Sequence, residues 1–193
     1  MRIIKLGGSL CRGELLDHWL EAVARTPRLV VVPGGGPFAD TIRSAQGTWG
    51  VDDGTAHRMA LLAMDQYALM LCPRHPRLRL THDAADIAAA LNSRRIPVWA
   101  PYQWLSPGHD DVTESWDFTA DSLALWLGIR LVAEEVLLVK SVDAPAGADA
   151  GDLARAGVVD ACFPMLQTRT GVPFRILGPS DLPEVGAPIP APG

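Results

Sequence analysis

Two glycine-rich segments, each directly after a short apolar stretch, are the parts of this sequence best suited to bind phosphate. The first is Lys5–Ser9 and the second is Pro33–Gly36, which Pro37 follows. Glycines let the backbone turn tightly and approach a ligand, and Pro37 suits the first position of a helix. A strand, a glycine loop and a helix N-terminus in succession aim unpaired N–H groups at one point. We therefore expect an anion site at each loop, the alternative being a tight turn without a ligand.

A lysine lies at the end of two of the expected strands. Lys5 stands just before the first glycines, and Lys140 follows the apolar run Glu135–Val139. A buried lysine is costly unless an anion pairs with it. In a parallel α/β sheet, ligands bind at the carboxyl ends of the strands, where both lysines and both glycine loops would meet. Two anion-binding loops and a lysine at one edge of the sheet are the least that a site needs to bind two phosphate-bearing molecules at once.

Further polar residues are candidates for the same site. Trp116–Gly128 predicts a helix with Thr119 as its N-cap and Asp121 in its first turn. The structural interpretation is a well-capped helix, and the functional one is an acid that holds lysines or a magnesium ion beside phosphate. His57 and Arg58 do not fit the apolar stripe of their helix, so they belong either to a polar face near the site or to ordinary solvated surface.

Composition limits the class of protein. The chain has 193 residues, of which 48% are hydrophobic and 20% charged, and this is enough for one domain with a full core. A formal net charge of -5 argues against a nucleic-acid surface. We expect no membrane partner and a cytoplasmic location, because no apolar run reaches membrane-spanning length and the N-terminus shows no signal peptide. Three distant cysteines argue against disulfides or a zinc site.

Strand and helix patterns alternate along the chain, which predicts an α/β domain over residues 1–180 and a proline-rich, extended or disordered tail over 181–193. Residues 47–54 read as a loop with a turn at Asp52–Gly54. Residues 101–116 form a long connection of the kind that covers active sites, and Trp99, Trp104 and Trp116 would cluster there. The predicted strands are 3–6, 29–32, 78–81, 97–100, 135–139 and 173–177, and the predicted helices are 14–26, 37–46, 55–72, 83–94, 119–128 and 160–170.

Four motifs, in this order and spacing, resemble the amino acid kinase family, which includes the acetylglutamate, aspartate and uridylate kinases. They are Lys5–Ser9, Pro33–Gly36, Thr119–Ala124 and Leu137–Asp143. Within the family, the chain is most similar to the short aminomethylfuran phosphate kinases of methanofuran biosynthesis. The points of similarity are the helix 57–67, the pair Trp116-Asp117 and the stretch 159–164.

The resemblance implies a three-layer α/β/α sandwich around a mostly parallel sheet. It also implies magnesium-dependent transfer of a phosphoryl group from ATP to a small molecule, with the magnesium ion held by ATP phosphates rather than by a protein ligand set. In the subfamily the acceptor is a furan phosphomonoester and the product a diphosphate. Relatives are typically homo-oligomers, dimers or larger.

The family's site residues map onto this sequence motif by motif. The resemblance implies catalytic roles for Lys5, Asp121 and Lys140. It implies nucleotide binding by Gly7, Gly8, Ser9, Lys140, Ser141 and Asp143. It implies acceptor binding by Gly34, Gly35 and Gly36, and the residue types add Arg43, His57, Arg58 and Thr119 as candidates.

The sequence also departs from larger relatives. They commonly carry a second catalytic lysine late in the chain, whereas no lysine lies between Gly151 and Thr170. Ser141 and Ala144 replace the usual aspartate and glycine of the loop after the strand at 135–139. Two alternatives therefore stay open: a kinase of another acceptor (a carboxylate, carbamate or nucleoside monophosphate), or a non-catalytic nucleotide-binding or storage protein of the same fold.

Overall fold

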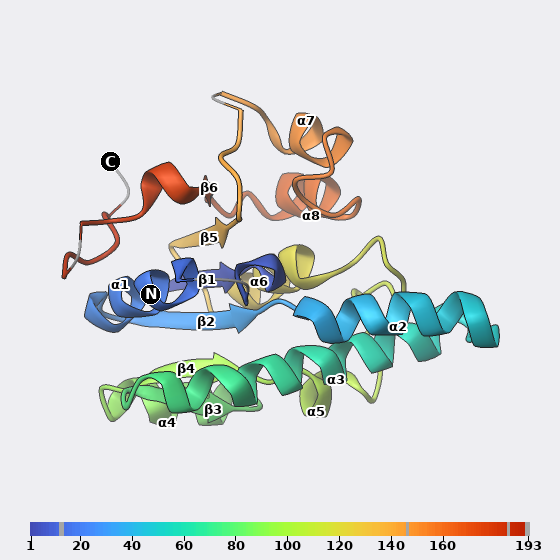
Figure 1. Cartoon of the computed structure of the whole chain (residues 1–193), viewed down its shortest axis with the longest axis horizontal. Helices are drawn as coiled ribbons and strands as arrows, with labels where there is room; N and C mark the ends of the chain where they lie inside the picture. The colour runs from blue at the N-terminus through green and yellow to red at the C-terminus, as the bar shows by residue number, and fades with distance from the viewer. Residues whose placement is uncertain (12–13, 146, 185, 192–193) are drawn as a thin grey trace.

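A six-stranded parallel sheet forms the centre of the protein (Figure 1). The computed structural model describes residues 1–11, 14–145, 147–184 and 186–191. The strand order is β3-β4-β2-β1-β5-β6. The strands are β1 Arg2–Leu6, β2 Leu29–Pro33, β3 Leu78–Thr81, β4 Ile96–Trp99, β5 Glu135–Val139 and β6 Phe174–Leu177. The predicted α/β class with a mostly parallel sheet is confirmed.

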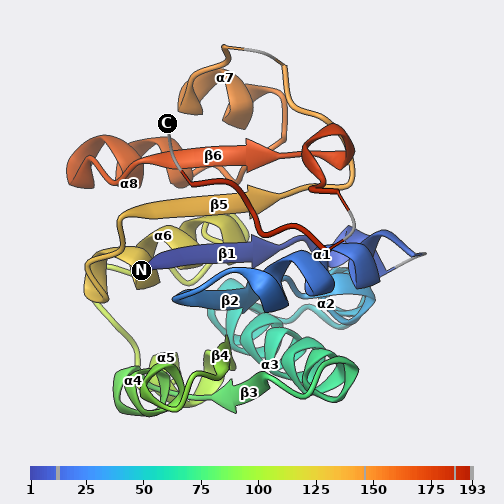
Figure 2. The same ribbon diagram turned by 90° about the vertical axis from the view of Figure 1, so that its left-hand side faces the viewer.

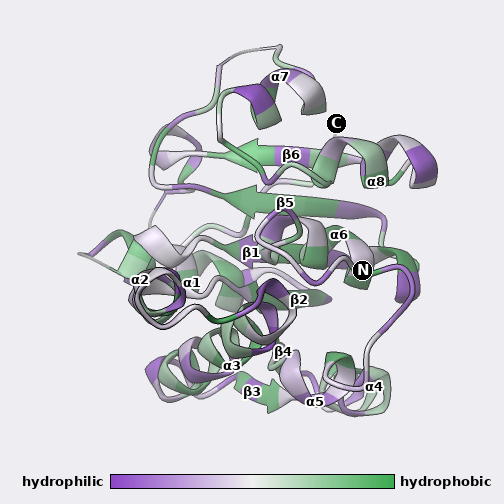
Figure 3. Ribbon diagram, turned by 90° about the vertical axis from the view of Figure 1, so that its right-hand side faces the viewer, coloured by the Kyte–Doolittle hydropathy of each residue, from purple (hydrophilic) through white to green (hydrophobic). Residues whose placement is uncertain are grey.

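Helices cover both faces of the sheet, so the three predicted layers are present (Figure 2). Alternate residues of β1 point to opposite faces: Ile3 packs in the cluster with α6 (Ala120–Arg130), and Ile4 packs in the cluster with α1 (Leu15–Arg25). The central strands β1, β2 and β5 are buried on both faces, which explains their unbroken apolar runs. Figure 3 shows β5 as hydrophobic along most of its length.

Most of the remaining helices lie close to their predicted positions, but the short ones at 102–105 and 150–155 lie where no helix is predicted. The remaining helices are α2 Gly36–Trp49, α3 Asp53–Leu71, α4 Ala84–Asn92, α5 Tyr102–Leu105, α7 Ala150–Arg155 and α8 Phe163–Thr170, with short 3-10 turns at Gly8–Cys11, Cys72–Arg74 and Pro179–Asp181. The loop predicted over 47–54 is wrong. The helix α2 runs on through Gly47 until Gly50 ends it in the left-handed conformation, and Asp52 caps α3 by accepting from the Thr55 amide at 2.9 Å.

The pair α2 and α3 extends beyond the carboxyl ends of the strands (Figure 1). None of the α2 residues is fully buried, so one side of this helix faces solvent. In the described part of the chain, no helix combines the length and apolar character needed to cross a membrane.

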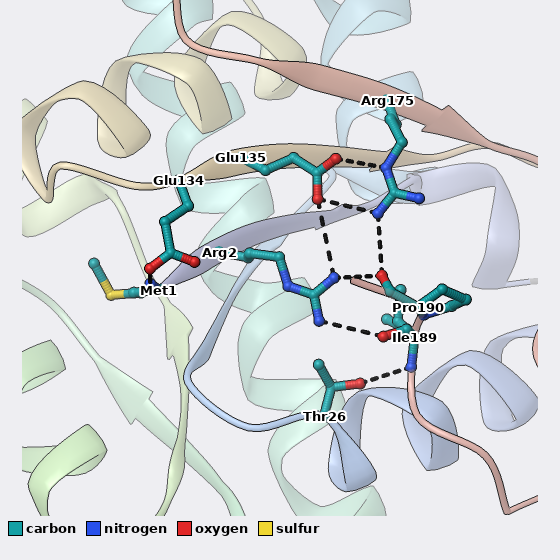
Figure 4. Close-up of polar contacts among 8 residues, drawn as sticks. All are labelled: Met1, Arg2, Thr26, Glu134, Glu135, Arg175, Ile189 and Pro190. Atoms are coloured by element: carbon teal, nitrogen blue, oxygen red, sulfur yellow. Dashed lines mark hydrogen bonds and ion pairs between the residues drawn. The ribbon is translucent and has the colours of Figure 1, made fainter. Parts of the chain in front are cut away.

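The described part of the C-terminal tail reaches the amino ends of the central strands (Figure 4). Arg2 donates to the carbonyl of Pro190 at 2.7 Å and to that of Ile189 at 3.2 Å. The Ile189 amide donates to Thr26 Oγ1 at 2.9 Å, and the Ile189 side chain is buried. Residues 185 and 192–193 of the predicted tail lie outside the described residues.

Candidate active site

The two glycine loops lie against each other at the carboxyl ends of β1 and β2. The Gly34 amide donates to the Leu6 carbonyl at 2.9 Å, and a Cβ atom on Gly34 would lie 2.5 Å from the Gly8 nitrogen. A Cβ on Gly8 would in turn collide with the backbone of Gly36, whose φ of +55° also favours glycine. Contact between the loops therefore demands glycine here, independently of any ligand.

A carboxylate holds two ammonium groups beside these loops. Asp121, in the first turn of α6, has its Oδ1 atom 2.9 Å from the Nζ atom of Lys5. Lys140 Nζ lies 2.9 and 2.8 Å from the two Asp121 oxygens. These are the only two lysines in the sequence. The chain thus gathers the ammonium groups of both lysines at one buried point.

Burial and mutual charge set the protonation of this cluster. Although burial raises the pKa of Asp121, the two lysines outweigh it and hold the pKa below the ordinary value. Burial lowers the pKa of Lys140 to about 8, and repulsion from Lys5 adds to the fall, while Asp121 opposes it. At neutral pH the cluster is a carboxylate with ammonium groups on both sides, which leaves a net positive charge for an anion to neutralise.

A cavity of about 410 Å³ opens between the two glycine loops, α2, α3 and the segment before α6. Its lining combines Lys5 and the two glycine loops with the apolar and aromatic side chains of Leu61, Met64, Trp116 and Phe118. Its lining residues are Lys5, Gly8, Ser9, Cys11, Gly34, Gly35, Gly36, Pro37, Ala39, Asp40, Arg43, His57, Ala60, Leu61, Met64, Ser115, Trp116, Phe118, Thr119, Ala120 and Leu123. Its size suits a small molecule.

The predicted site residues divide into those that line this cavity and those behind or beside it. Among the predicted acceptor-binding residues, Gly34, Gly35, Gly36, Arg43, His57 and Thr119 line it. Arg58 does not, and its guanidinium pairs with Glu114 at 2.9 Å. Asp121 and Lys140 do not line it, and Asp121 pairs with the Lys5 ammonium that does.

On the predicted nucleotide side, Gly7 donates its amide to the Val139 carbonyl at 3.1 Å, which ties the first loop to the end of β5. Ser9 Oγ lies 3.0 Å from Ser141 Oγ, so the first loop also reaches the loop after β5. Asp143 instead accepts from the amide and hydroxyl of Ser180 at 3.0 and 2.8 Å, and these bonds occupy its Oδ1 atom.

Arg43 lines the cavity on a side chain that Trp116 supports. The guanidinium carbon lies 4.3 Å from the centroid of the Trp116 ring, and the indole N–H donates to Gln46 Oε1 at 2.5 Å. No hydrogen bond or ion pair joins the Arg43 guanidinium to any described residue. Its donors are therefore available to a ligand in the cavity.

The predicted cluster of three tryptophans is wrong in one member. Trp99 and Trp104 pack with Trp126, at ring-centroid distances of 5.9, 5.9 and 5.4 Å. Trp116 stays apart from them at the cavity, because its indole bonds to α2.

His57 is buried in the cavity wall, and burial lowers its pKa, so its imidazole is neutral at neutral pH.

Sequence reasoning missed Asp160 as part of this region. Its carboxylate accepts from Thr119, Ser122 and Phe163, which joins the starts of α6 and α8. The sequence does show an aspartate three residues before the start of a helix, which is a pattern typical of helix capping. Nothing in the sequence, however, links this aspartate to Asp121. In the described part of the chain, no group of three or more His, Cys, Asp or Glu side chains is arranged to hold a metal ion.

Comparison with known proteins agrees with this geometry. The sequence profile described as "Amino acid kinase family" matches residues 1–144. A curated relative, the (5-(aminomethyl)furan-3-yl)methyl phosphate kinase of Methanocaldococcus jannaschii, is 27% identical over 179 residues, which cover 86% of this chain and 82% of the relative.

Solved structures of the same fold are similar over nearly their whole length. The uridylate kinase of Archaeoglobus fulgidus superposes with a TM-score of 0.66 at 19% identity, covering 91% of this chain and 89% of its own. The isopentenyl phosphate kinase of T. acidophilum superposes with a TM-score of 0.56 at 15% identity, covering 92% and 90%. These two likenesses concern the fold.

Proposed function

Because this chain belongs to the amino acid kinase family, we propose that it transfers a phosphoryl group from ATP to a small phosphomonoester, (5-(aminomethyl)furan-3-yl)methyl phosphate, and forms the diphosphate. Members of this family are kinases, and the chain is one by that membership. The acceptor, the nucleotide and the place of this step in making a methanofuran-type carrier of one-carbon units are parts of the proposal.

The observation that carries the proposal is the pair of lysines on Asp121 next to two glycine loops. Phosphoryl transfer requires positioning and charge neutralisation more than covalent chemistry by the protein. Lys5, which lines the cavity, would neutralise charge on the transferred group. Lys140 would neutralise charge on the nucleotide side, in place of the late lysine that larger relatives carry. Asp121 would hold both ammonium groups in position.

The residues present fit ATP with its magnesium ion. Backbone N–H groups of Gly8 and Ser9 and the two ammonium groups suit phosphate oxygens, whereas the Gly7 amide is already bonded to Val139. We place Ser141 and Asp143 at the border of the same nucleotide site, because Ser141 contacts Ser9. Asp121 is already engaged with both lysines, so magnesium would be held by the ATP phosphates. There the ion would supply neutralisation of the phosphate charge.

Three features of the cavity support a phosphomonoester acceptor. The second glycine loop offers the N–H groups of Gly35 and Gly36, since that of Gly34 bonds to Leu6, and the Arg43 guanidinium is free to form a bidentate pair with a phosphate. His57 adds a polar contact, whereas the Thr119 hydroxyl already donates to Asp160 Oδ2 at 2.9 Å and can only accept from the substrate. The curated relative and the two solved structures described above each carry a phosphorylated acceptor in their names: a furan phosphate, uridylate and isopentenyl phosphate.

The rest of the cavity suits a flat ring with an ammonium group. Trp116 and Phe118 offer aromatic surface beside Leu61 and Met64. Among the described lining residues, Asp40 is the one carboxylate, and it would face the aminomethyl group. A site that pairs a charged group of its substrate rejects analogues that lack it, because its own group is then left without a partner.

The test is ADP release with ATP and magnesium, screening the furan phosphate against UMP, carbamate and acetylglutamate. Release with the furan phosphate alone supports the whole proposal. Release with another acceptor keeps the kinase and replaces the substrate. Release with none, together with tight nucleotide binding by calorimetry, favours a binding or storage role.

Asp40→Asn refines the substrate assignment. We expect the variant to lose affinity for the furan phosphate but not for the analogue without the amino group, whereas the wild type should prefer the aminated compound. Equal affinity of wild type and variant for the aminated compound would remove Asp40 from the proposal.

We also propose that the chain forms homo-oligomers. Leu62, Leu69 and Met70 on α3 are 41%, 57% and 39% exposed, and contact with a second copy would cover them. Sedimentation equilibrium at several concentrations tests this, and a monomer at every concentration would contradict it.

A further inference from the structure

The carboxylate of Asp160 is the most heavily bonded side chain near the cluster of Lys5, Asp121 and Lys140. Its Oδ2 atom accepts from Thr119 N at 2.9 Å, Thr119 Oγ1 at 2.9 Å and Ser122 N at 3.0 Å. Its Oδ1 atom accepts from Ser122 Oγ and from Phe163 N, the latter at 3.1 Å. Each oxygen is therefore saturated, and the side chain has no freedom to turn.

These bonds fix the backbone on both sides of Asp121. Thr119 stands two residues before it and Ser122 one residue after it, and Asp160 holds both. Thr119 is the N-cap residue of α6 by position, yet its own side chain makes no capping bond to the helix. Asp160 supplies the cap from 38 residues further along the chain.

The position of the Asp160 carboxylate beside that of Asp121 has an electrostatic cost, and the need to cap α6 does not by itself explain why a carboxylate stands there. Burial raises the pKa of Asp160, and the nearby Asp121 carboxylate raises it further. A serine or asparagine cap would hold the start of α6 without placing a second carboxylate beside Asp121. Only a carboxylate, however, has two acceptor oxygens that can bond α6 and α8 together while both are fixed.

We propose that Asp160 is a positioning residue, which holds the first turn of α6 so that the Asp121 carboxylate stays between Lys5 and Lys140. The inference rests on the proposed kinase function, since it deepens the roles given to those three residues. Asp160 itself contacts none of the reacting groups. Its effect reaches the chemistry through the position of Asp121.

The experiment compares Asp160→Ala and Asp160→Asn with a matched control. The control is Asp83→Asn, because Asp83 caps α4 by accepting from the Asp86 amide at 2.9 Å and lies outside the proposed site. Each protein is tested for turnover as a function of pH and for the KM values of ATP and acceptor. Circular dichroism melts define the temperature range in which each variant is folded.

We expect kcat of folded Asp160→Ala to fall by on the order of 100-fold, with smaller changes in either KM, because a small misplacement of a catalytic group is enough for such a loss. Asp160→Asn should recover part of the activity, since its single carbonyl oxygen can still cap α6 but cannot also accept from α8. Asp83→Asn should match the wild type in kcat and pH profile.

A second measurement does not depend on turnover. Because the chain has two lysines, acetylation by acetic anhydride followed by mass spectrometry reports on Lys140 separately from Lys5. If Asp121 moves away from Lys140, the ammonium loses the anion that offsets burial and repulsion from Lys5. The pH midpoint of Lys140 acetylation should therefore be lower in Asp160→Ala than in the wild type.

The outcomes separate this inference from the proposed function. If Asp160→Ala is folded and keeps the wild-type kcat and acetylation midpoint, the positioning role is wrong. If the wild type shows no kinase activity but the midpoint shifts as expected, the function is wrong and the positioning role stands. If Asp160→Ala does not fold, Asp160→Asn is held to the same criteria.

Discussion

Lys5 and Lys140 approach one carboxylate from neighbouring parallel strands. Lys5 lies within β1, where it pairs in register with Leu138 of β5, and Lys140 follows directly after β5. The Lys140 amide donates to the Leu177 carbonyl at 2.8 Å, so β6 fixes its backbone. The relative position of the two ammonium groups is thus set by sheet register, which is rigid, rather than by loops.

Replacing either lysine should remove catalysis without removing the fold. In Lys5→Met or Lys140→Met, the remaining lysine still pairs with Asp121, so the buried carboxylate is not left alone. We expect kcat to fall by roughly 10³-fold or more, the scale of a charge that stabilises phosphoryl transfer. Turnover and circular dichroism check this. Near-normal kcat in Lys140→Met would show that Lys140 does not replace the late lysine.

Turnover should decline on the alkaline side. The pKa of Lys140, lowered to about 8 by burial and by Lys5, means that its ammonium is present below pH 8 and lost above it. We expect kcat to fall by roughly tenfold per pH unit well above pH 8. Any activity that remains in Lys140→Arg should not decline above pH 8, because a guanidinium keeps its charge. If kcat of Lys140→Arg declines at the same pH as that of the wild type, the decline is due to another group.

Gly34 should tolerate no side chain, whereas Gly47 in the last turn of α2 should tolerate one. A Cβ at Gly34 would lie 2.5 Å from the Gly8 backbone nitrogen, so Gly34→Ala must separate the two loops. We expect a loss of about 1–3 kcal/mol in the free energy of unfolding and a large loss of activity. Gly47→Ala is the control: no atom lies within 4 Å of the added Cβ, and the helical position should gain about 0.5–1 kcal/mol. Urea unfolding measures both.

Arg43 and Trp116 should act as a unit on acceptor affinity. Arg43→Ala is expected to raise the acceptor KM by roughly 10- to 100-fold, the worth of a charged hydrogen bond, and to leave the KM of ATP unchanged. Trp116→Ala should raise it less, and the effect of the double variant should be smaller than the product of the two single effects, because Trp116 acts partly by holding Arg43. Strictly additive effects would mean that the ring does not position the guanidinium.

Much of this architecture could be predicted from local sequence patterns. Unbroken apolar runs such as Val30–Val32 indicate buried parallel strands, and glycines and lysines at strand ends indicate where the ligands would bind. The structure brings Lys5, Asp121 and Lys140 together as the motifs implied. Their catalytic and binding roles stay predictions until they are measured.

What could not be predicted depends on contacts between distant segments. The helix α2 passes through Gly47, although the glycine suggested a loop, because Gly50 is the residue that adopts the left-handed ending. Trp116 bonds to Gln46, 70 residues away, rather than joining the other tryptophans. Asp160 caps a helix 38 residues earlier. No periodicity or motif encodes such pairings, since each depends on how whole elements pack.

The C-terminal segment should contribute to stability. The Ile189 side chain is 3% exposed and packs in the core on the α1 side, so Ile189→Ala is expected to lower the free energy of unfolding by about 2–5 kcal/mol. Pro188→Ala, next to it but exposed, is the matched control and should change little. Urea denaturation distinguishes them, and equal midpoints would mean that the segment does not pack in solution as it does here.

The bond between Arg2 and the Pro190 carbonyl, 2.7 Å long, has a topological consequence. It places the beginning of the chain beside the described end of it, at the amino ends of the strands, whereas the cavity opens at their carboxyl ends. The two described ends of the polypeptide therefore lie next to each other. Circular permutants, joined by a short linker and reopened at an exposed turn such as Val132, would keep every strand and both glycine loops intact.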